Sequence, residues 1–292
     1  DKKVIARVTD AYRRIRNTLR FLLANVSDFD PTTDTVPLDQ MLEIDRYALA
    51  RAAQFQGEVL AHYAVYEFHP VVAKLQVYCS EDLGAFYLDV LKDRLYTAAP
   101  GSHARRSAQT ALHHIAHAML RWMAPFLSFT AEEAWPMLAG AQNKGSIFFE
   151  TWADLPVADE GLLAKWTRLC EIRNLANKEI EAVRTQGAVG SSLQALLTIT
   201  APADDAALLR SLGDDLRFVT ITSGATVLDG AELTLSLGSV LESPARREAR
   251  IGFAQSRMAG QVAPSGRSSP WSISQRMASA LSCSLPSSKP LQ

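Results

Sequence analysis

Residues 9–30, TDAYRRIRNTLRFLLANVSDFD, decide the fold of the N-terminal half of the chain. Apolar residues recur at every third or fourth position here and just before this segment, so the pattern predicts one amphipathic helix over residues 1–27. The predicted apolar face consists of Ile5, Val8, Tyr12, Ile15, Leu19, Leu22 and Val26. A second stripe beside that face gathers Arg13, Arg16, Asn17 and Arg20, because successive helical residues are rotated by about 100°.

The arginine stripe of this helix has two interpretations. Any mixture of polar residues keeps the outer face of a helix in water, and a solvated face is the ordinary role of such a stripe. This stripe is almost entirely guanidinium, however, and the forked donors of arginine match phosphate oxygens in geometry and charge. The sequence alone leaves both interpretations open.

The composition excludes several classes of protein. A hydrophobic fraction of 48% is enough for a folded core. The net charge of −1 over 292 residues gives no global basic field, so nucleic-acid binding would need local patches. No apolar run reaches the roughly 18–20 residues that a membrane span needs, and the N-terminus does not have the pattern of a signal peptide. We therefore expect a soluble, cytoplasmic protein that does not contact a membrane.

The cysteines argue against a disulfide framework. Cys79, Cys170 and Cys283 are odd in number and far apart, and no CxxC pair provides half of a zinc site. The chain also lacks Met at position 1 and starts inside a helical pattern, like a piece cut from a longer protein.

Further helical segments follow a polar loop at residues 29–39. Periodicity predicts helices over residues 40–63, 67–92, 103–123 and 159–186. Ser102 is the predicted N-cap of the third of these helices, and Gly187 is expected to end the last.

A capping-box pattern, Thr130-Ala-Glu-Glu133, lies between two of these helices. It predicts a short helix that ends near Pro136, and it assigns Glu132 and Glu133 to helix capping. Residues 146–152, SIFFETW, are expected to form a short extended piece.

Beyond residue 187 the pattern changes from helical to alternating. Short β-branched segments predict strands at 192–200, 216–223 and 232–238, with a small helix at 203–211. From Ala249 onward there is no Asp or Glu and no apolar period, so we expect a disordered or non-native tail. The predicted fold is mainly α, with a helical bundle at 1–150, a linker helix at 151–187, a small α/β domain at 188–241 and an unstructured or out-of-frame tail at 242–292.

The residues alone predict no catalytic site. His113 and His117 have the i, i+4 spacing of a helical metal pair, but no Glu follows the first His and no third ligand is visible. An exposed or RNA-facing pair of histidines is therefore the favoured interpretation. The segment Gly187–Gly190 follows a helix and precedes a strand, which is the reverse of the order in a phosphate-binding loop.

Two long motifs resemble the anticodon-binding region of bacterial isoleucyl-tRNA synthetases. They are YRRIRNTLRFLLANVSDFDP at residues 12–31 and RSAQTALHHIAHAMLRWMAPFLSFTAEEAW at residues 106–135. Shorter segments that fit the same family are KDRLYTA (92–98), VGSSLQA (189–195) and LRFVTITSGATV (216–227). The resemblance extends over roughly residues 1–240.

This resemblance implies an RNA-binding function. The family consists of class I ligases that use ATP and magnesium to join isoleucine to its tRNA, with catalytic and editing domains upstream of this region. The family's His-Ile-Gly-His and Lys-Met-Ser-Lys-Ser signatures do not occur in this sequence, so the chain alone is not expected to bind ATP or activate isoleucine. It is expected to hold the anticodon stem and loop of isoleucine tRNA, as a monomer without its own cofactor. If the catalytic domain is separately encoded, it is a second expected partner.

The resemblance also assigns candidate RNA contacts. The predicted tRNA-binding residues are Arg13, Arg14, Arg16, Asn17, Arg20, Arg105, Arg106 and Arg121, with Arg46 and Arg94 as weaker candidates. Arg16 and Asn17 have an alternative role, since they could form hydrogen bonds between helices. Two other functions stay open: a helical scaffold that binds protein, and the equivalent domain of a valyl-, leucyl- or methionyl-tRNA synthetase.

The C-terminal tail departs from the family. Bacterial members typically end in a zinc-binding tail with two paired-cysteine motifs, whereas this resemblance stops near Leu241 and the remainder has a single cysteine. We expect no zinc site here, and we interpret the tail as a diverged end or as translation out of frame.

Overall fold

The computed structural model of the chain describes residues 2–139, 145–186 and 189–239. They all belong to one compact unit, Asp1–Glu242. The predicted tail at 242–292, with its expected lack of a zinc site, lies outside the described residues, and so does the predicted helix end at Gly187. The proposed divisions at residues 150 and 187 stay a prediction.

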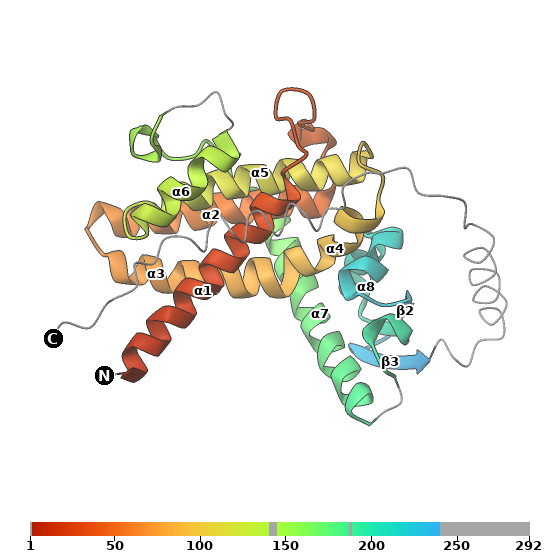
Figure 1. Ribbon diagram of the computed structural model, residues 1–292. Helices are drawn as coiled ribbons and strands as arrows, with labels where there is room; N and C mark the ends of the chain where they lie inside the picture. Colours follow the sequence, from red (N-terminus) through yellow and green to blue (C-terminus); the bar gives the residue numbers. More distant parts are fainter. Residues whose placement is uncertain (1, 140–144, 187–188, 240–292) are drawn as a thin grey trace, which may run out of the picture. The chain divides into compact units, whose positions relative to one another are not determined.

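The first part of the chain is almost entirely helical (Figure 1). Its elements are α1 (Lys2–Asn25), η1 (Leu38–Gln40), α2 (Glu43–Ala64), α3 (Phe68–Val77), η2 (Tyr78–Tyr87), α4 (Leu88–Thr97), α5 (His103–Met123), α6 (Ser128–Ala139), η3 (Ile147–Phe149) and α7 (Glu160–Thr185). The mainly α prediction is confirmed, and the predicted helices at 1–27, 40–63, 103–123 and 159–186 match α1, α2, α5 and α7.

Helix α5 lies at the centre of the bundle, where it contacts α1, α2, α4 and α6. Ser102 caps it as predicted, because its hydroxyl accepts a hydrogen bond from the Arg105 N–H. Its apolar residues Leu112, Ile115 and Met119 are buried, and its polar residues are covered as well: Thr110 is buried, and His113 and His117 are only partly exposed. This helix therefore has no fully solvated face from residue 107 onward.

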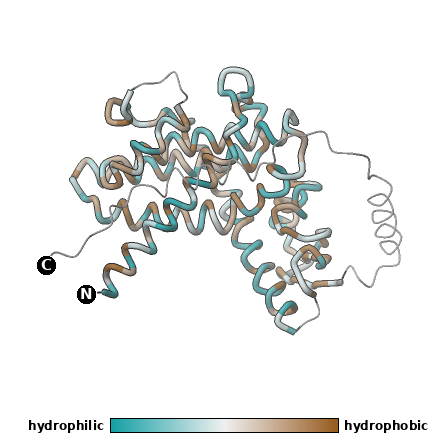
Figure 2. Tube along the Cα trace, viewed as in Figure 1, coloured by the Kyte–Doolittle hydropathy of each residue, from teal (hydrophilic) through white to brown (hydrophobic). Residues whose placement is uncertain are grey.

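Helix α1 packs on the bundle only along its C-terminal part. Ile15, Leu19 and Leu22 are buried, as the apolar stripe predicted. Ile5 and Val8 continue the same stripe but are exposed. Figure 2 shows hydrophobic and hydrophilic residues alternating along this N-terminal part of α1.

The predicted helix at 67–92 is longer and less regular than its pattern indicated. It runs as α3, a π-helical segment η2 and α4, and it ends at Thr97. Gly84 is needed in the π-helical segment, because a Cβ at this position would lie 2.9 Å from the carbonyl oxygen of Cys79. The wider π turn shifts side chains relative to a regular α-helix and shapes the surface that faces α7.

Two short elements differ from the predictions. Helix α6 begins at Ser128 and continues past Pro136 to Ala139. Glu132 does not cap it, because its carboxylate accepts hydrogen bonds from the Ser146 hydroxyl (2.8 Å) and the Ile147 N–H (3.1 Å). These bonds hold the segment after α6 in a 3₁₀ turn, η3, where an extended piece was predicted.

Helix α7 contacts both the bundle and a small sheet. At its N-terminal end, Trp166 donates to Glu43 of α2 through its indole N–H (3.1 Å). Further along, the guanidinium of Arg173 donates to the carbonyl oxygens of Val219 (2.8 Å) and Ala85 (3.2 Å). One almost fully buried arginine thus connects three parts of the chain that are far apart in sequence.

The small sheet has three strands in the order β2-β1-β3. They are β1 (Ala195–Ala201), β2 (Gly224–Asp229) and β3 (Thr234–Ser239), and α8 (Ala203–Arg210) follows β1. Strands β1 and β2 are parallel, with Leu196 opposite Gly224, and β1 and β3 are antiparallel. The predicted first and third strands and the small helix are confirmed.

The predicted strand at 216–223 is wrong. Residues Leu216–Thr220 form a short helix, α9, in which Leu216, Val219 and Thr220 are buried. That is the i, i+3, i+4 spacing of a helix, and it coexists with the β-branched composition that indicated a strand. Ile221 ends the helix in the left-handed region at φ 54°, and strand β2 begins only at Gly224.

Candidate nucleic-acid interface

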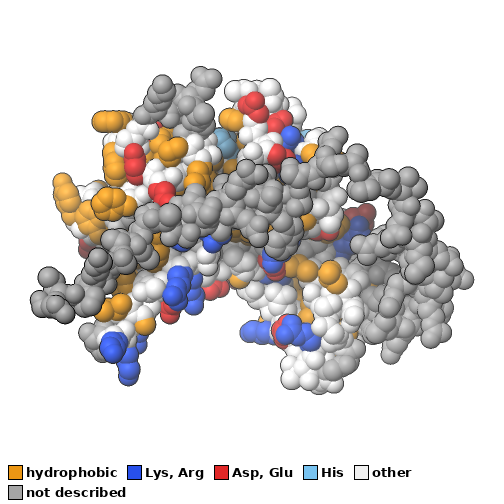
Figure 3. Space-filling model, in the orientation of Figure 1, with side chains coloured by type: hydrophobic (Ala, Val, Ile, Leu, Met, Phe, Trp, Pro, Cys, Tyr) orange, Lys and Arg blue, Asp and Glu red, His pale blue; other side chains and the backbone are white. Residues whose placement is uncertain are grey.

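Helix α1 concentrates positive charge. Its sequence has seven basic residues and one acidic residue, although the whole chain has a net charge of −1. Arg13 and Arg14 are exposed, and Arg16 and Arg20 are partly buried beside the apolar stripe. Figure 3 shows Lys and Arg side chains gathered along the part of the molecule that α1 forms. The concentrated charge provides the local patch that nucleic-acid binding needs in a chain without a global field.

The exposed arginines of α1 form few ion pairs with carboxylates of the protein. Arg13 lies 3.4 Å from Asp10, and 69% of its side chain is accessible, so this pair contributes little to stability. Arg14 and Arg20 have no ion pair with any residue in the described ranges 2–139, 145–186 and 189–239. Asn17 is exposed between them. We call Arg13, Arg14, Arg16, Asn17 and Arg20 the α1 arginine face.

Arg105 and Arg106 have a different environment at the start of α5. The Arg105 guanidinium forms a two-point ion pair with Asp28, at 2.7 and 3.1 Å. Arg106 donates to the carbonyl oxygen of Asp28 (3.2 Å) and the side chain of Gln109 (2.7 Å), and it lies 3.1 Å from Asp34. These contacts fasten the loop after α1 to the N-terminal end of α5.

Asp28 is the centre of this cluster. Burial raises the pKa of its carboxyl, but hydrogen bonds from Arg105 and Gln109 outweigh that effect, so the pKa lies below its ordinary value. Gln109 also donates to the carbonyl oxygen of Asn25 (2.9 Å), the last residue of α1. The cluster therefore fixes the path of the backbone immediately after α1.

Arg121 is also held inside the protein. It donates to the Glu150 carboxylate (2.7 Å) and to the carbonyl oxygen of Thr151 (2.8 Å). Its guanidinium lies over the ring of Trp135, 4.8 Å from the centroid, where a cation–π interaction adds to the ion pair. Arg121 therefore joins α5 to α6 and to the segment after η3.

The weaker candidates Arg94 and Arg46 also face the interior. Arg94 donates twice to Asp45, at 3.1 and 3.3 Å, and the hydroxyls of Tyr87 and Ser107 donate to the same fully buried carboxylate. The Nε of Arg46 is buried and has no hydrogen-bond partner among the described residues. We call Arg94, Arg105, Arg106 and Arg121 the carboxylate-bound arginines.

His113 and His117 of α5 pack against aromatic rings in edge-to-face or tilted arrangements and are half-buried, not exposed as predicted. The His113 and His117 ring centroids are 4.5 Å apart, and these rings also contact Phe29 and Trp135, respectively. Burial lowers the pKa of His113 to about 4 and the pKa of His117 to about 3, with neighbouring positive charge as a smaller cause. No group of three or more His, Cys, Asp or Glu side chains that could hold a metal ion occurs within the described part of the chain.

The structure divides the predicted contacts into two sets. On the α1 arginine face, Arg13, Arg14 and Asn17 are exposed and Arg16 and Arg20 are partly buried, whereas Arg105, Arg106 and Arg121 serve contacts within the protein. Sequence reasoning missed the carboxylates Asp28, Asp45 and Glu150 that hold these arginines. Asp45 left no clear signal, since it lies in the first turn of α2 beside Glu43, where acidic residues are common. None of the helices in the described ranges is long and apolar enough to cross a membrane.

Comparison with known proteins agrees with this architecture. Residues 45–200 match the family described as the anticodon-binding domain of tRNA ligase. The chain is 59% identical over 234 residues to an isoleucine–tRNA ligase of Cupriavidus necator, which is 79% of this chain and 24% of the relative. It is 60% identical over 229 residues to the corresponding ligase of Burkholderia multivorans, which is 78% of this chain and again 24% of the relative.

The chain thus spans about a quarter of the length of the curated relatives it matches. The family match covers more than half of the chain, from α2 through the bundle and α7 to the first strand of the small sheet. The chain therefore belongs to the family of anticodon-binding domains of tRNA ligases.

Proposed function

We propose that this chain binds the anticodon stem and loop of isoleucine tRNA and serves aminoacylation as part of an isoleucine–tRNA ligase. The family supplies the general function, and the names of the relatives favour the isoleucine enzyme over the valyl, leucyl and methionyl branches. Chemistry with ATP and magnesium would belong to the catalytic domain of such a ligase. A cytoplasmic location and a monomeric state are parts of the same proposal.

The observation that carries this proposal is the charge of α1. Arginines reach phosphates as forked donors, and an arginine without a carboxylate partner binds a phosphate without first losing an internal ion pair. The α1 arginine face meets this condition at Arg14 and Arg20, and nearly so at Arg13. Contacts of this kind position an RNA stem, while its unpaired bases carry the sequence information.

Filter binding with the full chain tests this proposal. We expect weak binding that favours isoleucine tRNA over bulk tRNA and falls steeply with salt, because each phosphate contact releases counterions. Arg13→Ala, Arg14→Ala and Arg20→Ala combined should lower the affinity and reduce the slope of log K against log salt by about one per lost contact.

A matched variant controls for total charge. Lys178, Arg184 and Arg217 are exposed on α7 and α9, and replacing all three with Ala removes the same number of positive charges away from α1. We expect this variant to bind tRNA almost as the unaltered chain does. Equal losses in both triple variants would contradict the assignment to α1, and an equal affinity for bulk tRNA would contradict the isoleucine assignment.

A helical scaffold that binds protein is the alternative function. It predicts that the α1 triple variant leaves RNA binding unchanged, so the same experiment distinguishes the two functions.

A further inference from the structure

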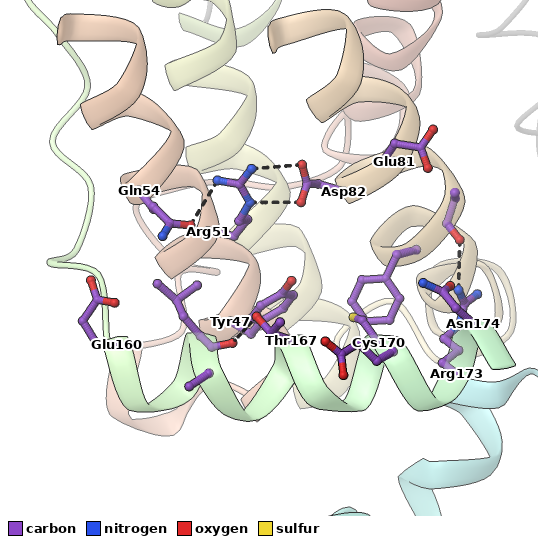
Figure 4. Close-up of a pocket in the computed structure, with 15 residues that line it drawn as sticks. Tyr47, Arg51, Gln54, Glu81, Asp82, Glu160, Thr167, Cys170, Arg173 and Asn174 are labelled. Carbon is purple, nitrogen blue, oxygen red and sulfur yellow. Dashed lines mark hydrogen bonds and ion pairs between the residues drawn. The ribbon is translucent and has the colours of Figure 1, made fainter. Parts of the chain in front are cut away.

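The pocket between α2, the π-helical segment η2 and α7 is lined by arginines that already pair within the protein (Figure 4). Arg51 forms a two-point contact with Asp82, at 3.0 and 3.3 Å. Arg173 donates to the carbonyl oxygen of Ala85 (3.2 Å). These contacts leave neither guanidinium free to hold a ligand, so the candidate for a further function lies on another surface.

Exposed aromatic residues concentrate in three segments, 61–70, 125–133 and 146–157, which we call the aromatic end. Figure 3 shows hydrophobic side chains gathered there, over α6 and over the turn between α2 and α3. An exposed apolar surface of this kind is typical of an interaction site. Six of the eight exposed Phe, Tyr and Trp residues in the described ranges 2–139, 145–186 and 189–239 belong to it: Tyr66, Phe68, Phe129, Phe148, Phe149 and Trp152.

Contacts between the three segments make the aromatic end one surface. The ring of Tyr63, near the end of α2, contacts Phe68 of α3 at 5.4 Å and Trp152 at 5.6 Å between centroids. Glu132 of α6 holds the start of η3 through its bonds to Ser146 and Ile147. Side chains that are far apart in sequence are therefore neighbours here.

The exposed apolar stripe of α1 begins beside the aromatic end. The Tyr12 hydroxyl lies 3.3 Å from the Thr130 hydroxyl of α6, and Phe129 next to it is 93% exposed. Val8 lies one turn before Tyr12 on the same face of α1, and Ile5 lies about one turn before Val8. Because Ile5 and Val8 are exposed, they extend the aromatic end along α1.

The charge of the aromatic end disfavours RNA as its partner. Surfaces that stack nucleic-acid bases combine aromatic rings with a positively charged groove for the backbone. The three segments contain no Lys or Arg, and their five carboxylates would repel phosphates. The carboxylates are those of Glu67, Glu132, Glu133, Glu150 and Asp154. A protein surface with an apolar centre and a basic rim fits the aromatic end better.

The rest of a tRNA ligase is a partner of this kind. The chain spans about a quarter of the length of the relatives it matches, so a complete ligase places much more protein beside this unit. A tRNA held on α1 reaches a reaction centre only if the bundle has a fixed orientation relative to that centre. Docking through a rigid apolar surface provides such an orientation.

We infer that the aromatic end, together with Ile5 and Val8 of α1, docks against the catalytic domain of the ligase. Phe129 and Phe149, the most exposed rings of α6 and η3, enter the apolar centre of that contact. This inference rests on the proposed function, since it takes the partner from the same ligase. It concerns a different surface from the α1 arginine face, so the two can be tested separately.

Sedimentation velocity tests this docking with the full chain and the Cupriavidus necator ligase from which the matching segment has been removed. Isoleucine-dependent exchange of pyrophosphate into ATP reports that the shortened ligase is folded. We expect a one-to-one complex. Phe129→Asp and Phe149→Asp should each weaken it roughly 10-fold or more, because each places a charge in an apolar contact. Both side chains are exposed in the chain alone, so neither variant should lower its thermal midpoint.

A matched variant controls for the loss of an exposed ring. Tyr96 on α4 is 65% exposed and lies outside the aromatic end, so Tyr96→Asp should leave the complex unchanged. A second measurement uses the complete ligase in which this chain replaces the matching segment. There Phe129→Asp should lower the thermal midpoint of the bundle, although it does not do so in the chain alone.

Four results would overturn this inference. They are no complex with a shortened ligase that still exchanges pyrophosphate, an equal loss with Tyr96→Asp, a self-associated chain that Phe129→Asp makes monomeric, and a loss of tRNA affinity in Phe129→Asp alone. The third result would assign the aromatic end to a second copy of the chain, and the fourth to RNA. If the shortened ligase does not exchange pyrophosphate, an unchanged midpoint of Phe129→Asp in the complete ligase overturns it. The α1 triple variant should still dock, so tRNA binding that does not depend on α1 would contradict only the proposed function.

Discussion

Arg13 on α1 and Arg106 on α5 carry the same guanidinium, yet 69% of the Arg13 side chain is exposed against 18% of Arg106. The difference comes from the acidic residues around each helix. Asp10 is the single acidic residue of α1, whereas Asp28 and Asp34 of the following loop converge on Arg106. An arginine near an RNA-binding surface is therefore a candidate contact only when no internal carboxylate already holds it.

The comparison assigns two roles. Arg13, Arg14 and Arg20 of the α1 arginine face are the proposed phosphate contacts, and the carboxylate-bound arginines hold loops and helices in place. Replacing a carboxylate-bound arginine or its partner should mainly lower the free energy of unfolding. Replacing an arginine of the α1 arginine face should mainly lower the affinity for RNA and the salt dependence of that affinity.

The largest effect is expected at Asp45, the fully buried carboxylate that holds Arg94. Asp45→Ala leaves this guanidinium and the hydroxyls of Tyr87 and Ser107 without their shared acceptor. We expect a loss of about 3–5 kcal/mol in the free energy of unfolding, measured by urea denaturation. A loss below about 1 kcal/mol would show that this cluster does not stabilise the fold.

The histidines of α5 should make stability depend on pH. Burial first, and nearby positive charge second, depress the pKa of His113 to about 4 and that of His117 to about 3. Between about pH 6.5 and pH 4 the unfolded chain therefore binds more protons than the folded chain, so stability is complete above pH 6.5 and falls on acidification.

Each of these imidazoles contributes a slope of up to about 1.4 kcal/mol per pH unit in that window. Replacing both with Gln should flatten the slope of unfolding free energy against pH. Carboxylates such as Asp28, whose pKa lies below its ordinary value of 3.8, add their own loss only at lower pH. An unchanged slope in the double variant would mean that this face of α5 is solvated, contrary to the packing described here.

Arg106 should give a smaller loss of stability. Arg106→Ala removes hydrogen bonds to Asp28 and Gln109 and the ion pair with Asp34, at a partly exposed site. We expect a loss of about 1–2 kcal/mol in thermal or urea unfolding, with tRNA affinity changed less than in the α1 triple variant. A stable Arg106→Ala protein that no longer binds tRNA would move Arg106 to the RNA-contacting set.

Arg14 should give the smallest effect on stability. Its side chain is exposed and has no ion pair within the described ranges, so Arg14→Ala should change the unfolding free energy by no more than about 0.5 kcal/mol. The same variant should reduce the salt slope of tRNA binding by about one. A clear loss of stability would place Arg14 among the structural arginines.

Local sequence signals predicted most of the helical fold. The Ser102 cap and the periodicity of α5 depend on residues within a few positions of each other, and both were confirmed. The segment at 216–223 was wrongly predicted as a strand, because Leu216 and Val219 pack at helical spacing and override the β-branched composition. The long π-helical segment was likewise not visible, since a single Gly84 inside a helical pattern does not specify it.

The division of the arginines could not be predicted from the sequence. Arg105 and Asp28 are 77 positions apart, and Arg121 and Glu150 are 29 positions apart, so no local pattern links them. Both regions have the arginine-rich pattern of a phosphate-binding helix. Only the packing of the loop after α1, and of the segment after η3, decides which guanidinium groups stay available.

The most direct test compares the salt dependence of tRNA binding in three proteins: the unaltered chain, the α1 triple variant and the matched triple variant at Lys178, Arg184 and Arg217. If α1 contacts the RNA phosphates, the slope of log K against log salt should be smaller by about three in the α1 variant. The slope should be unchanged in the matched variant. Equal slopes in all three proteins, with tRNA still bound, would contradict the assignment of RNA binding to α1.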